Sequence, residues 1–300
     1  MRAWTTTWAN PSTCVACWKP CPGGRSPEQP PKRRNVRLGW TGPRPHLVAL
    51  FRWRPTRLSF SDIVADLRDP GFHHALPEET DTLLDPRALK DWDAYADSWN
   101  DLGLDRFMAD GGRYRRRRFA AFSATADGVV ERKPHQPHYQ SRDYNSLNGG
   151  VQRWFEPITP MIAEHPLTQG LIRQGVALFH PLTPDAPAAW HVEAHQFRIE
   201  ADEGQLGQPT PEGAHRDGVD WVIVMLVERR NVASGVTDIF APDGTRLGAF
   251  VLERPRDAVF LDDHRVLHGV TAIRPLESGA PARRDVLVVT FRREDPSSGA

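Results

Sequence analysis

Cysteine is scarce in this sequence of 300 residues, and it is confined to the N-terminus. Cys14, Cys17 and Cys21 are the three cysteines, so the rest of the chain has no possible disulfide. Their spacing is similar to part of a zinc site, but a fourth ligand at a suitable spacing is missing. Packing, rather than cross-links, must therefore stabilise the fold.

The sequence also lacks net charge and long apolar runs. Lysine and arginine together number 38, equal to aspartate and glutamate, so no global field would attract nucleic acid or an anionic membrane. No stretch approaches the roughly 18 consecutive apolar residues of a membrane span, and the N-terminus has no signal-peptide core. We therefore expect a cytoplasmic protein with a small-molecule substrate, and no nucleic-acid or membrane partner.

Residues 1–45 differ in composition from the rest of the chain. They are rich in proline, glycine, arginine and lysine, and they carry no apolar period. This composition predicts a disordered N-terminal extension or a mis-assigned start of the chain. Residues 46–300 contain no internal repeat, and they are predicted to form a single domain.

Helical patterns dominate the first half of that domain. Apolar residues recur at spacings of three and four, and proline, glycine or a capping aspartate marks several ends. The predicted helices are Ser59–Leu67, ended by Pro70-Gly71; Asp85–Leu102, with Asp85 as N-cap and Pro86 in the first position; Val151–Glu164; and Leu167–Phe179. The stripe of the second helix is expected to cover a sheet.

Strand patterns dominate the second half, after an earlier strand at Tyr114–Ala124 that begins with an arginine run. Six short runs rich in β-branched and aromatic residues are separated by turn residues. They are Trp190–Ala201, Val219–Val227, Val236–Phe240, Leu247–Leu252, Ala258–Leu261 and Val286–Phe291. This order predicts an α+β fold, a double-stranded β-helix (jelly roll) supported by helices mostly from the N-terminal half.

The segment most informative about chemistry is Glu212-Gly-Ala-His-Arg-Asp-Gly-Val-Asp-Trp221, at the entrance to a strong strand. Its His215 and Asp217 are two residues apart, so an extended backbone places both on one face. One imidazole and one carboxylate are two corners of the facial triad that suits iron(II). A second histidine must then come from elsewhere in the chain.

His268 is the best candidate for that histidine. It lies at the end of an apolar run, and Gly269 permits close approach of another backbone. In a jelly roll this strand can face the one that carries His215 and Asp217. Three protein ligands would leave three positions on an octahedral ion, two for the keto acid of 2-oxoglutarate and one for oxygen.

A 2-oxoglutarate co-substrate also needs a buried cation for its distal carboxylate. Arg283 and Arg284 open the last apolar strand, and a guanidinium can bind a carboxylate through two hydrogen bonds. Because both faces of this strand are apolar, alternation does not decide between the two arginines. Thr290 could add a hydroxyl if it shares the inward face with Arg284.

These residues resemble the bacterial 2-oxoglutarate/Fe(II) dioxygenases typified by L-isoleucine 4-hydroxylase. The resemblance extends from about Leu58 to Arg292, in matching order and spacing. The segments that carry it are Gly112–Arg118, Gln140, Asn145, Gly149–Phe155, His195–Arg198, Gly213–Trp221, Phe260–Asp263, Leu267–Ile273 and Arg284–Phe291.

The resemblance implies an enzyme whose iron ligands are His215, Asp217 and His268, not His264, and whose 2-oxoglutarate arginine is Arg284. It implies Fe(II), 2-oxoglutarate and O2 as cofactor and co-substrates, with ascorbate as reductant in vitro. The implied reaction is hydroxylation of an unactivated side-chain carbon of a free L-amino acid, giving succinate and CO2. Where relatives often have a glycine pair, this chain has Ala233-Ser-Gly235, which bears on substrate identity.

An amino-acid substrate would need a cation for its carboxylate and an acceptor for its ammonium group. Arg118, Asn145 and Trp221 are candidates for this pocket wall. Arg118 as a solvated residue, Asn145 as a turn cap and Trp221 as a core residue are the alternatives. His195 and Arg198 would either orient the metal ligands or form ion pairs with Glu193 or Glu200.

Two other classes of protein could carry the same pattern. A cupin-type metalloenzyme without a keto acid would present histidines and carboxylates from similar strands, but it would not need Arg284. A metal-free binding protein on the same fold would have no reason to keep all three ligands.

Overall fold

The computed structural model describes residues 60–145 and 147–294, which all fall within one compact unit. The predicted extension at residues 1–45 lies outside the described residues. A seven-stranded antiparallel sheet forms the main layer, in the order β1-β9-β5-β12-β4-β2-β3. Its strands are β1 (Phe72–Ala75), β2 (Arg115–Thr125), β3 (Val130–Arg132), β4 (Ala189–Ala201), β5 (Trp221–Arg230), β9 (Ala258–Asp262) and β12 (Ala282–Arg293).

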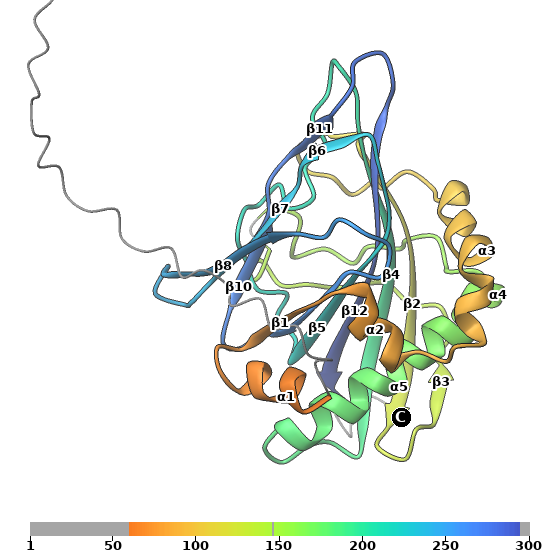
Figure 1. Cartoon of the computed structure of the whole chain (residues 1–300), viewed down its shortest axis with the longest axis vertical. Helices are drawn as coiled ribbons and strands as arrows, with labels where there is room; N and C mark the ends of the chain where they lie inside the picture. Colours follow the sequence, from red (N-terminus) through yellow and green to blue (C-terminus); the bar gives the residue numbers. More distant parts are fainter. Residues whose placement is uncertain (1–59, 146, 295–300) are drawn as a thin grey trace, which may run out of the picture. The chain divides into compact units, whose positions relative to one another are not determined.

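Two smaller sheets complete the β structure. One has the order β10-β7-β8 and the other pairs β11 with β6. The strands are β6 (Val232–Ser234), β7 (Val236–Phe240), β8 (Arg246–Val251), β10 (Leu267–Val270) and β11 (Ile273–Pro275). Buried Ile239 of β7 packs with Val222 and Val259 of the main sheet. The three-stranded sheet therefore lies against the inner face of the main sheet, as in the predicted jelly roll (Figure 1).

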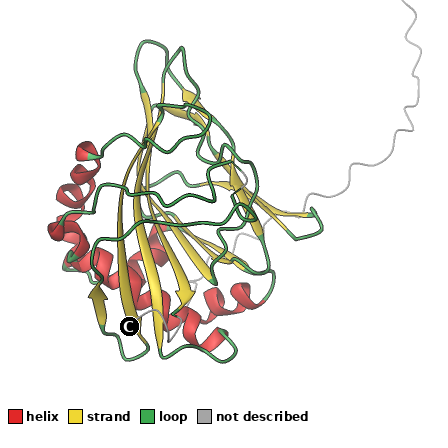
Figure 2. Cartoon of the chain, turned by 180° about the vertical axis from the view of Figure 1, so that it is seen from behind, coloured by secondary structure: helices red, strands yellow, loops and turns green. Residues whose placement is uncertain are grey.

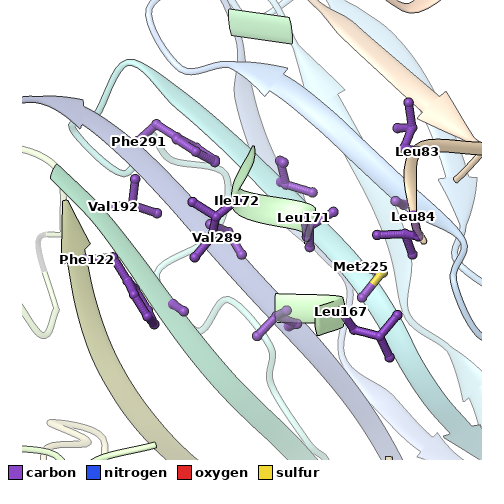
Figure 3. Close-up of a cluster of buried hydrophobic side chains, with 14 of the residues drawn as sticks. Leu83, Leu84, Phe122, Leu167, Leu171, Ile172, Val192, Met225, Val289 and Phe291 are labelled. Atoms are coloured by element: carbon purple, nitrogen blue, oxygen red, sulfur yellow. The ribbon is translucent and has the colours of Figure 1, made fainter. Parts of the chain in front are cut away.

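Helices cover the outer face of the main sheet (Figure 2). They are α1 (Phe60–Arg68), α2 (Pro77–Leu83), α3 (Trp92–Asp97), α4 (Pro160–Ala163) and α5 (Pro166–Phe179), with 3-10 turns η1 (Ala88–Asp91), η2 (Ser98–Asp101) and η3 (His180–Leu182). Leu167, Leu171 and Ile172 of α5 pack on Val192 and Val289 of the sheet (Figure 3). This outer core anchors the strands whose opposite face carries polar residues.

The predicted helix at Asp85–Leu102 is wrong as a single helix. The Asp85 side chain accepts a hydrogen bond from the Arg87 amide at 2.8 Å, yet the segment divides into η1, α3 and η2. Its apolar stripe still faces the sheet as expected, because Tyr95 and Trp99 are buried in the outer core. The indole of Trp99 donates to the Phe197 carbonyl at 3.1 Å, which ties this segment to β4.

The predicted helix at Val151–Glu164 is also wrong for most of its length, because only α4 is helical. Pro157 interrupts the segment, and it has no N–H for a helical hydrogen bond. The backbone instead pairs with other extended segments, at Phe119 of β2 and between His138 and Arg153. This extended course brings Arg153 to the inner side of the sheet.

The six strands predicted after residue 189 are confirmed, with shifts of a few residues at their ends. The structure adds β6, β10 and β11, which have three or four residues each and give little periodicity in sequence. The last strand begins at Ala282 rather than Val286, so Arg284 lies within it. The helices at Ser59–Leu67 and Leu167–Phe179 are confirmed as α1 and α5.

Candidate metal centre

His215 and Asp217 lie in the connection between β4 and β5, and not in β5 itself. An isolated bridge pairs His215 with His268 of β10: the His215 amide donates to the His268 carbonyl at 3.0 Å, and the reverse bond is 2.9 Å. A Cβ on Gly269 would lie only 3.1 Å from Cα of Ala214. Glycine at this position therefore allows the two backbones to approach, as the sequence predicted.

The bridge brings His215, Asp217 and His268 together around one point. Their candidate ligand atoms all lie within 4.8 Å of one another. Nε2 of each histidine is 3.5 Å from a different oxygen of Asp217. Two imidazoles and one carboxylate in this arrangement are the donor set of a facial triad for iron(II).

The charges of these three groups are strongly coupled. Burial alone would raise the pKa of Asp217, but its hydrogen bond with His215 and the charge of His268 hold that pKa well below its usual range. Burial opposes protonation of His215, yet Asp217 and Glu212 raise its pKa to about 9. Burial lowers the pKa of His268 to about 4. A cation is thus favoured beside Asp217, and a metal ion would replace the proton.

Asp263 holds the Asp217 segment in place, a role that the sequence did not reveal. Its carboxylate accepts hydrogen bonds from the amides of Asp217, Gly218 and Val219 at 2.9, 2.8 and 3.1 Å. His215 Nδ1 is 3.0 Å from the Gly213 carbonyl, so Nε2 is directed toward Asp217. Such outer hydrogen bonds fix the orientation of metal ligands. The sequence signals for Asp263 were its position directly after the apolar strand β9 and its place in the family segment Phe260–Asp263, and neither indicated this role.

A cavity of about 370 Å³ contains all three residues and extends along the inner face of β4 and β12. Its charged lining includes Arg284, which is 2 % exposed, with Nε and Nη2 lacking any hydrogen-bond partner in the described part of the chain. Burial lowers the pKa of Arg284 to about 10, so it remains a cation at neutral pH. An unpaired buried guanidinium fits a ligand carboxylate.

The structure shows which of Arg283 and Arg284 faces the cavity, a choice that the sequence pattern left open. Arg283 points to the outer side and pairs with Glu228, Nε to Oε2 at 2.8 Å, whereas Arg284 lines the cavity. Thr290 also lines the cavity, so its side chain shares the inward face with Arg284. Six residues of strand separate the two, about 20 Å at the usual rise. They cannot hold the same carboxylate, which removes the role expected for Thr290 beside Arg284.

Of the three residues expected in the pocket wall, only Asn145 lines the cavity. Arg118 points away from it and donates to the carbonyls of Asp101 and Pro157 at 2.9 and 3.0 Å. Trp221 is a core residue, stacked on Phe179 with ring centroids 4.8 Å apart. The prediction that Arg118 and Trp221 form part of the pocket wall is therefore wrong.

His195 and Arg198 lie on opposite faces of β4. Arg198 forms a buried ion pair with Asp285 at 2.7 Å, rather than with either glutamate expected from sequence. His195 lines the cavity and is 3.6 Å from Glu193, as one of the alternatives predicted. His138, Glu193 and His195 form a second group whose possible metal-binding atoms lie within 4.8 Å of one another.

Arg117 distinguishes this second group from the first. Its Nη2 is 2.7 Å from Nδ1 of His195, and because arginine can only donate, that nitrogen is an acceptor. His138 and His195 both direct nitrogens at Glu193, at 2.8 and 3.6 Å. A guanidinium next to the group would repel a divalent ion, so hydrogen bonding is the better interpretation.

Comparison with known proteins defines the class. The sequence model of the family described as 2OG-Fe dioxygenase matches residues 96–290, and the chain belongs to this family. It is therefore a non-haem Fe(II)/2-oxoglutarate-dependent oxygenase that uses O2, as the sequence predicted. The cupin-type alternative without 2-oxoglutarate is overturned by this finding.

Among individual relatives, 3(1)-hydroxy-L-isoleucine 4-dioxygenase of Pantoea ananatis is 24% identical over 199 residues, 66% of this chain and 79% of its own length. L-isoleucine-4-hydroxylase of Bacillus thuringiensis is 28% identical over 156 residues, 51% of this chain and 64% of its own length. These matches confirm the resemblance stated from the sequence.

Solved structures agree on the fold. A bsmA homologue from Methylobium petroleophilum is similar with a TM-score of 0.72 and 37% identity, covering 81% of this chain and 98% of that one. The structure of IDO from Bacillus thuringiensis has a TM-score of 0.66 at 20% identity, covering 79% of this chain and 100% of that one.

None of the helices among the described residues has the length and apolar character that a membrane span requires. The cytoplasmic location expected from the sequence stays a prediction.

Proposed function

We propose that this protein hydroxylates an unactivated side-chain carbon of a free L-amino acid. The substrate, O2 and 2-oxoglutarate would give the hydroxyamino acid, succinate and CO2, with one oxygen atom in each of the first two products. The observation that carries the proposal is a single cavity that contains both the His-Asp-His group and the unpaired Arg284. The two curated relatives, whose names both refer to isoleucine, support an amino-acid substrate.

In this proposal His215, Asp217 and His268 bind the iron. When bound, Fe(II) and 2-oxoglutarate supply the oxidising chemistry. Asp217 would neutralise part of the charge of a bound ion, and Asp263 keeps the Asp217 backbone segment fixed through three hydrogen bonds. These three side chains would hold the ion at the wall of the cavity, where it would supply the chemistry that activates the keto acid and oxygen.

Arg284 would bind the distal carboxylate of 2-oxoglutarate and so set the direction in which the keto acid points. Val286 and Val288 follow Arg284 on the same face of β12 and line the cavity. Their apolar side chains exclude water from the aliphatic part of the co-substrate. A buried charge pair of this kind gains strength from the low local dielectric.

The test is a product screen. The protein is incubated with Fe(II), ascorbate, 2-oxoglutarate and the common L-amino acids, including arginine and lysine, together with citrulline. Mass spectrometry should find one amino acid that gains a single oxygen, only when 2-oxoglutarate is present, with an equal amount of succinate. The Asp217→Ala variant, checked for native folding by circular dichroism, serves as the inactive control. No amino-acid product from the wild type in the whole panel would contradict the proposal.

A further inference from the structure

The buried arginines of the cavity fall into two kinds. Arg115 and Arg117 share one buried carboxylate, that of Asp105, at 2.7 and 3.7 Å. Arg153 and Arg284 have no carboxylate within 4.0 Å in the described ranges. The proposed function gives Arg284 a ligand, the distal carboxylate of 2-oxoglutarate. Arg153 is left without an anion.

Arg153 is buried, although no carboxylate lies within 4.0 Å of it in the described residues. It is 2 % exposed, its Nη2 donates to the Gln140 side-chain oxygen at 3.4 Å, and its Nε has no hydrogen-bond partner among the described residues. Gln140 in turn donates to the Asp217 carbonyl at 3.0 Å. An isolated buried cation is costly, so this site favours an anion bound next to the metal-binding segment.

Glu212 has the opposite charge, and its carboxylate is only partly paired. Its side chain is 8 % exposed and lines the same cavity. Its Oε1 accepts a hydrogen bond from Asn145 at 3.4 Å and lies 3.6 Å from Nε2 of His215. Its Oε2 is buried and has no partner in the part of the chain that the structure describes. A ligand with a donor or a positive charge would satisfy this oxygen.

The two groups do not satisfy each other. No ion pair within 4.0 Å joins Arg153 to Glu212 in the described residues. Burial and the charge of Arg115 lower the pKa of Arg153, and the charges of Asp105 and Glu212 oppose this from a greater distance. We propose that Arg153 and Glu212 form the substrate subsite, in which Arg153 binds the α-carboxylate and Glu212 the α-ammonium group of a free amino acid.

This proposal rests on the proposed function and makes it more specific. In an α-amino acid the two charged groups are attached to one carbon, so one molecule can bridge the Arg153 guanidinium and the free oxygen of the Glu212 carboxylate. A simple carboxylic acid would leave Glu212 unsatisfied, and a simple amine would leave Arg153 unsatisfied. The subsite therefore selects a zwitterion, and the α-carbon would be anchored beside the metal while the side chain stays free to reach the oxidising centre.

The experiment compares the amino acid that the wild type oxidises with its α-carboxamide and its N-acetyl derivative. The wild type should prefer the amino acid by about 100-fold in kcat/KM over either analogue, because a buried charge is left unpaired in each case. Arg153→Met should raise KM for the amino acid by about 100-fold and remove the preference over the carboxamide. Glu212→Gln should weaken the preference over the N-acetyl derivative in the same way.

The controls are Arg116→Gln and Glu200→Gln, which remove the members of an ion pair outside the cavity. These variants should keep the wild-type KM and both preferences. KM for 2-oxoglutarate, measured in every variant, should change by less than about threefold, which a general structural defect would not allow.

The outcomes separate this subsite from the proposed function. If the wild type oxidises no amino acid, the proposed function fails and the subsite fails with it. If the wild type oxidises an amino acid but does not discriminate against either analogue, or if the two variants keep the wild-type preferences, the subsite alone is wrong. Should Arg153→Met not fold, Arg153→Lys, which keeps the charge but not the planar donor pair, should give an intermediate KM; an unchanged KM would overturn the proposal.

Discussion

The cavity contains two groups with the same composition, two histidines and one carboxylate, that differ in their surroundings. In the first, His215, Asp217 and His268, both histidines approach the carboxylate at 3.5 Å. No lysine or arginine bonds to this group within the described residues. In the second, His138, Glu193 and His195, the guanidinium of Arg117 contacts His195 at 2.7 Å.

The neighbouring residues, and not the types of ligand, therefore determine which of the two groups suits a metal ion. Asp217 helps to raise the pKa of His215 to about 9, so His215 is protonated at neutral pH in the absence of metal. A positive charge is therefore stabilised at this position. Burial lowers the pKa of His195 to about 3, and Arg117 adds positive charge nearby. The second group is therefore a neutralised hydrogen-bond network that forms part of the cavity wall.

The largest expected effect comes from removing the carboxylate of each group in turn. Asp217→Ala should lower the affinity for Fe(II) by at least about 100-fold and reduce turnover by about 1000-fold, because the ion loses its charged ligand. Glu193→Gln should keep Fe(II) affinity within about threefold. Anaerobic titration with Fe(II) measures both. Equal losses of Fe(II) affinity in the two variants would mean that the two groups do not differ as metal sites.

The next effect concerns the co-substrate. Arg284→Met should raise KM for 2-oxoglutarate by about 100-fold, because the distal carboxylate of the keto acid would lose its guanidinium partner. Arg283→Met is the matched control, since Arg283 pairs with Glu228 on the outer side. Steady-state kinetics at varied 2-oxoglutarate should show the control within about twofold of the wild type. A larger effect at Arg283 would reverse our assignment of the two arginines.

A smaller effect should appear in the pH dependence of stability. His195 has a pKa of about 3 when folded, against about 6.5 when unfolded, so the unfolded chain binds more protons below pH 6.5. Its contribution to stability is present above that pH and is lost as the pH falls toward 3. Between pH 7 and 5 this amounts to about 2 kcal/mol.

The measurement for His195 is urea unfolding of the metal-free protein at pH 7 and pH 5. His195→Gln should lose about 2 kcal/mol less than the wild type between these two values. An identical loss in both proteins would show that His195 is not the buried neutral group that distinguishes the second cluster.

The smallest effect is expected at Arg118. Arg118→Gln should cost about 1 kcal/mol, because the side chain bonds to two carbonyls and to exposed carboxylates outside the cavity. Thermal unfolding and steady-state kinetics test this together. A large change in KM for the amino acid, with little loss of stability, would restore the pocket role expected from the sequence.

Local patterns predicted the parts of the site that depend on short spacing. His215 and Asp217 are two residues apart, and Gly269 follows His268, so their chemistry could be inferred before the fold was known. Arg284 could be narrowed only to a pair, because β12 is buried on both faces and alternation is uninformative there. The inward position of Asn145 was also predicted.

The parts that failed depend on how distant segments pair. The segment around Arg153 has helix-like spacing, but Pro157 and pairing with His138 make it extended, and this hid a cavity arginine. In the arginine run of β2, Arg115 and Arg117 face the cavity and Arg118 faces away. Phe119 and Phe122 lie on opposite faces of β2 and both are buried, so the apolar pattern does not indicate which face of the strand points to the cavity.

The most direct test of the central claim is anomalous diffraction from crystals soaked with Mn(II) as a redox-stable substitute for Fe(II). We predict one peak, bonded to His215, Asp217 and His268, and none between His138, Glu193 and His195. A peak between His138, Glu193 and His195, or no peak at His215, Asp217 and His268, would contradict the account.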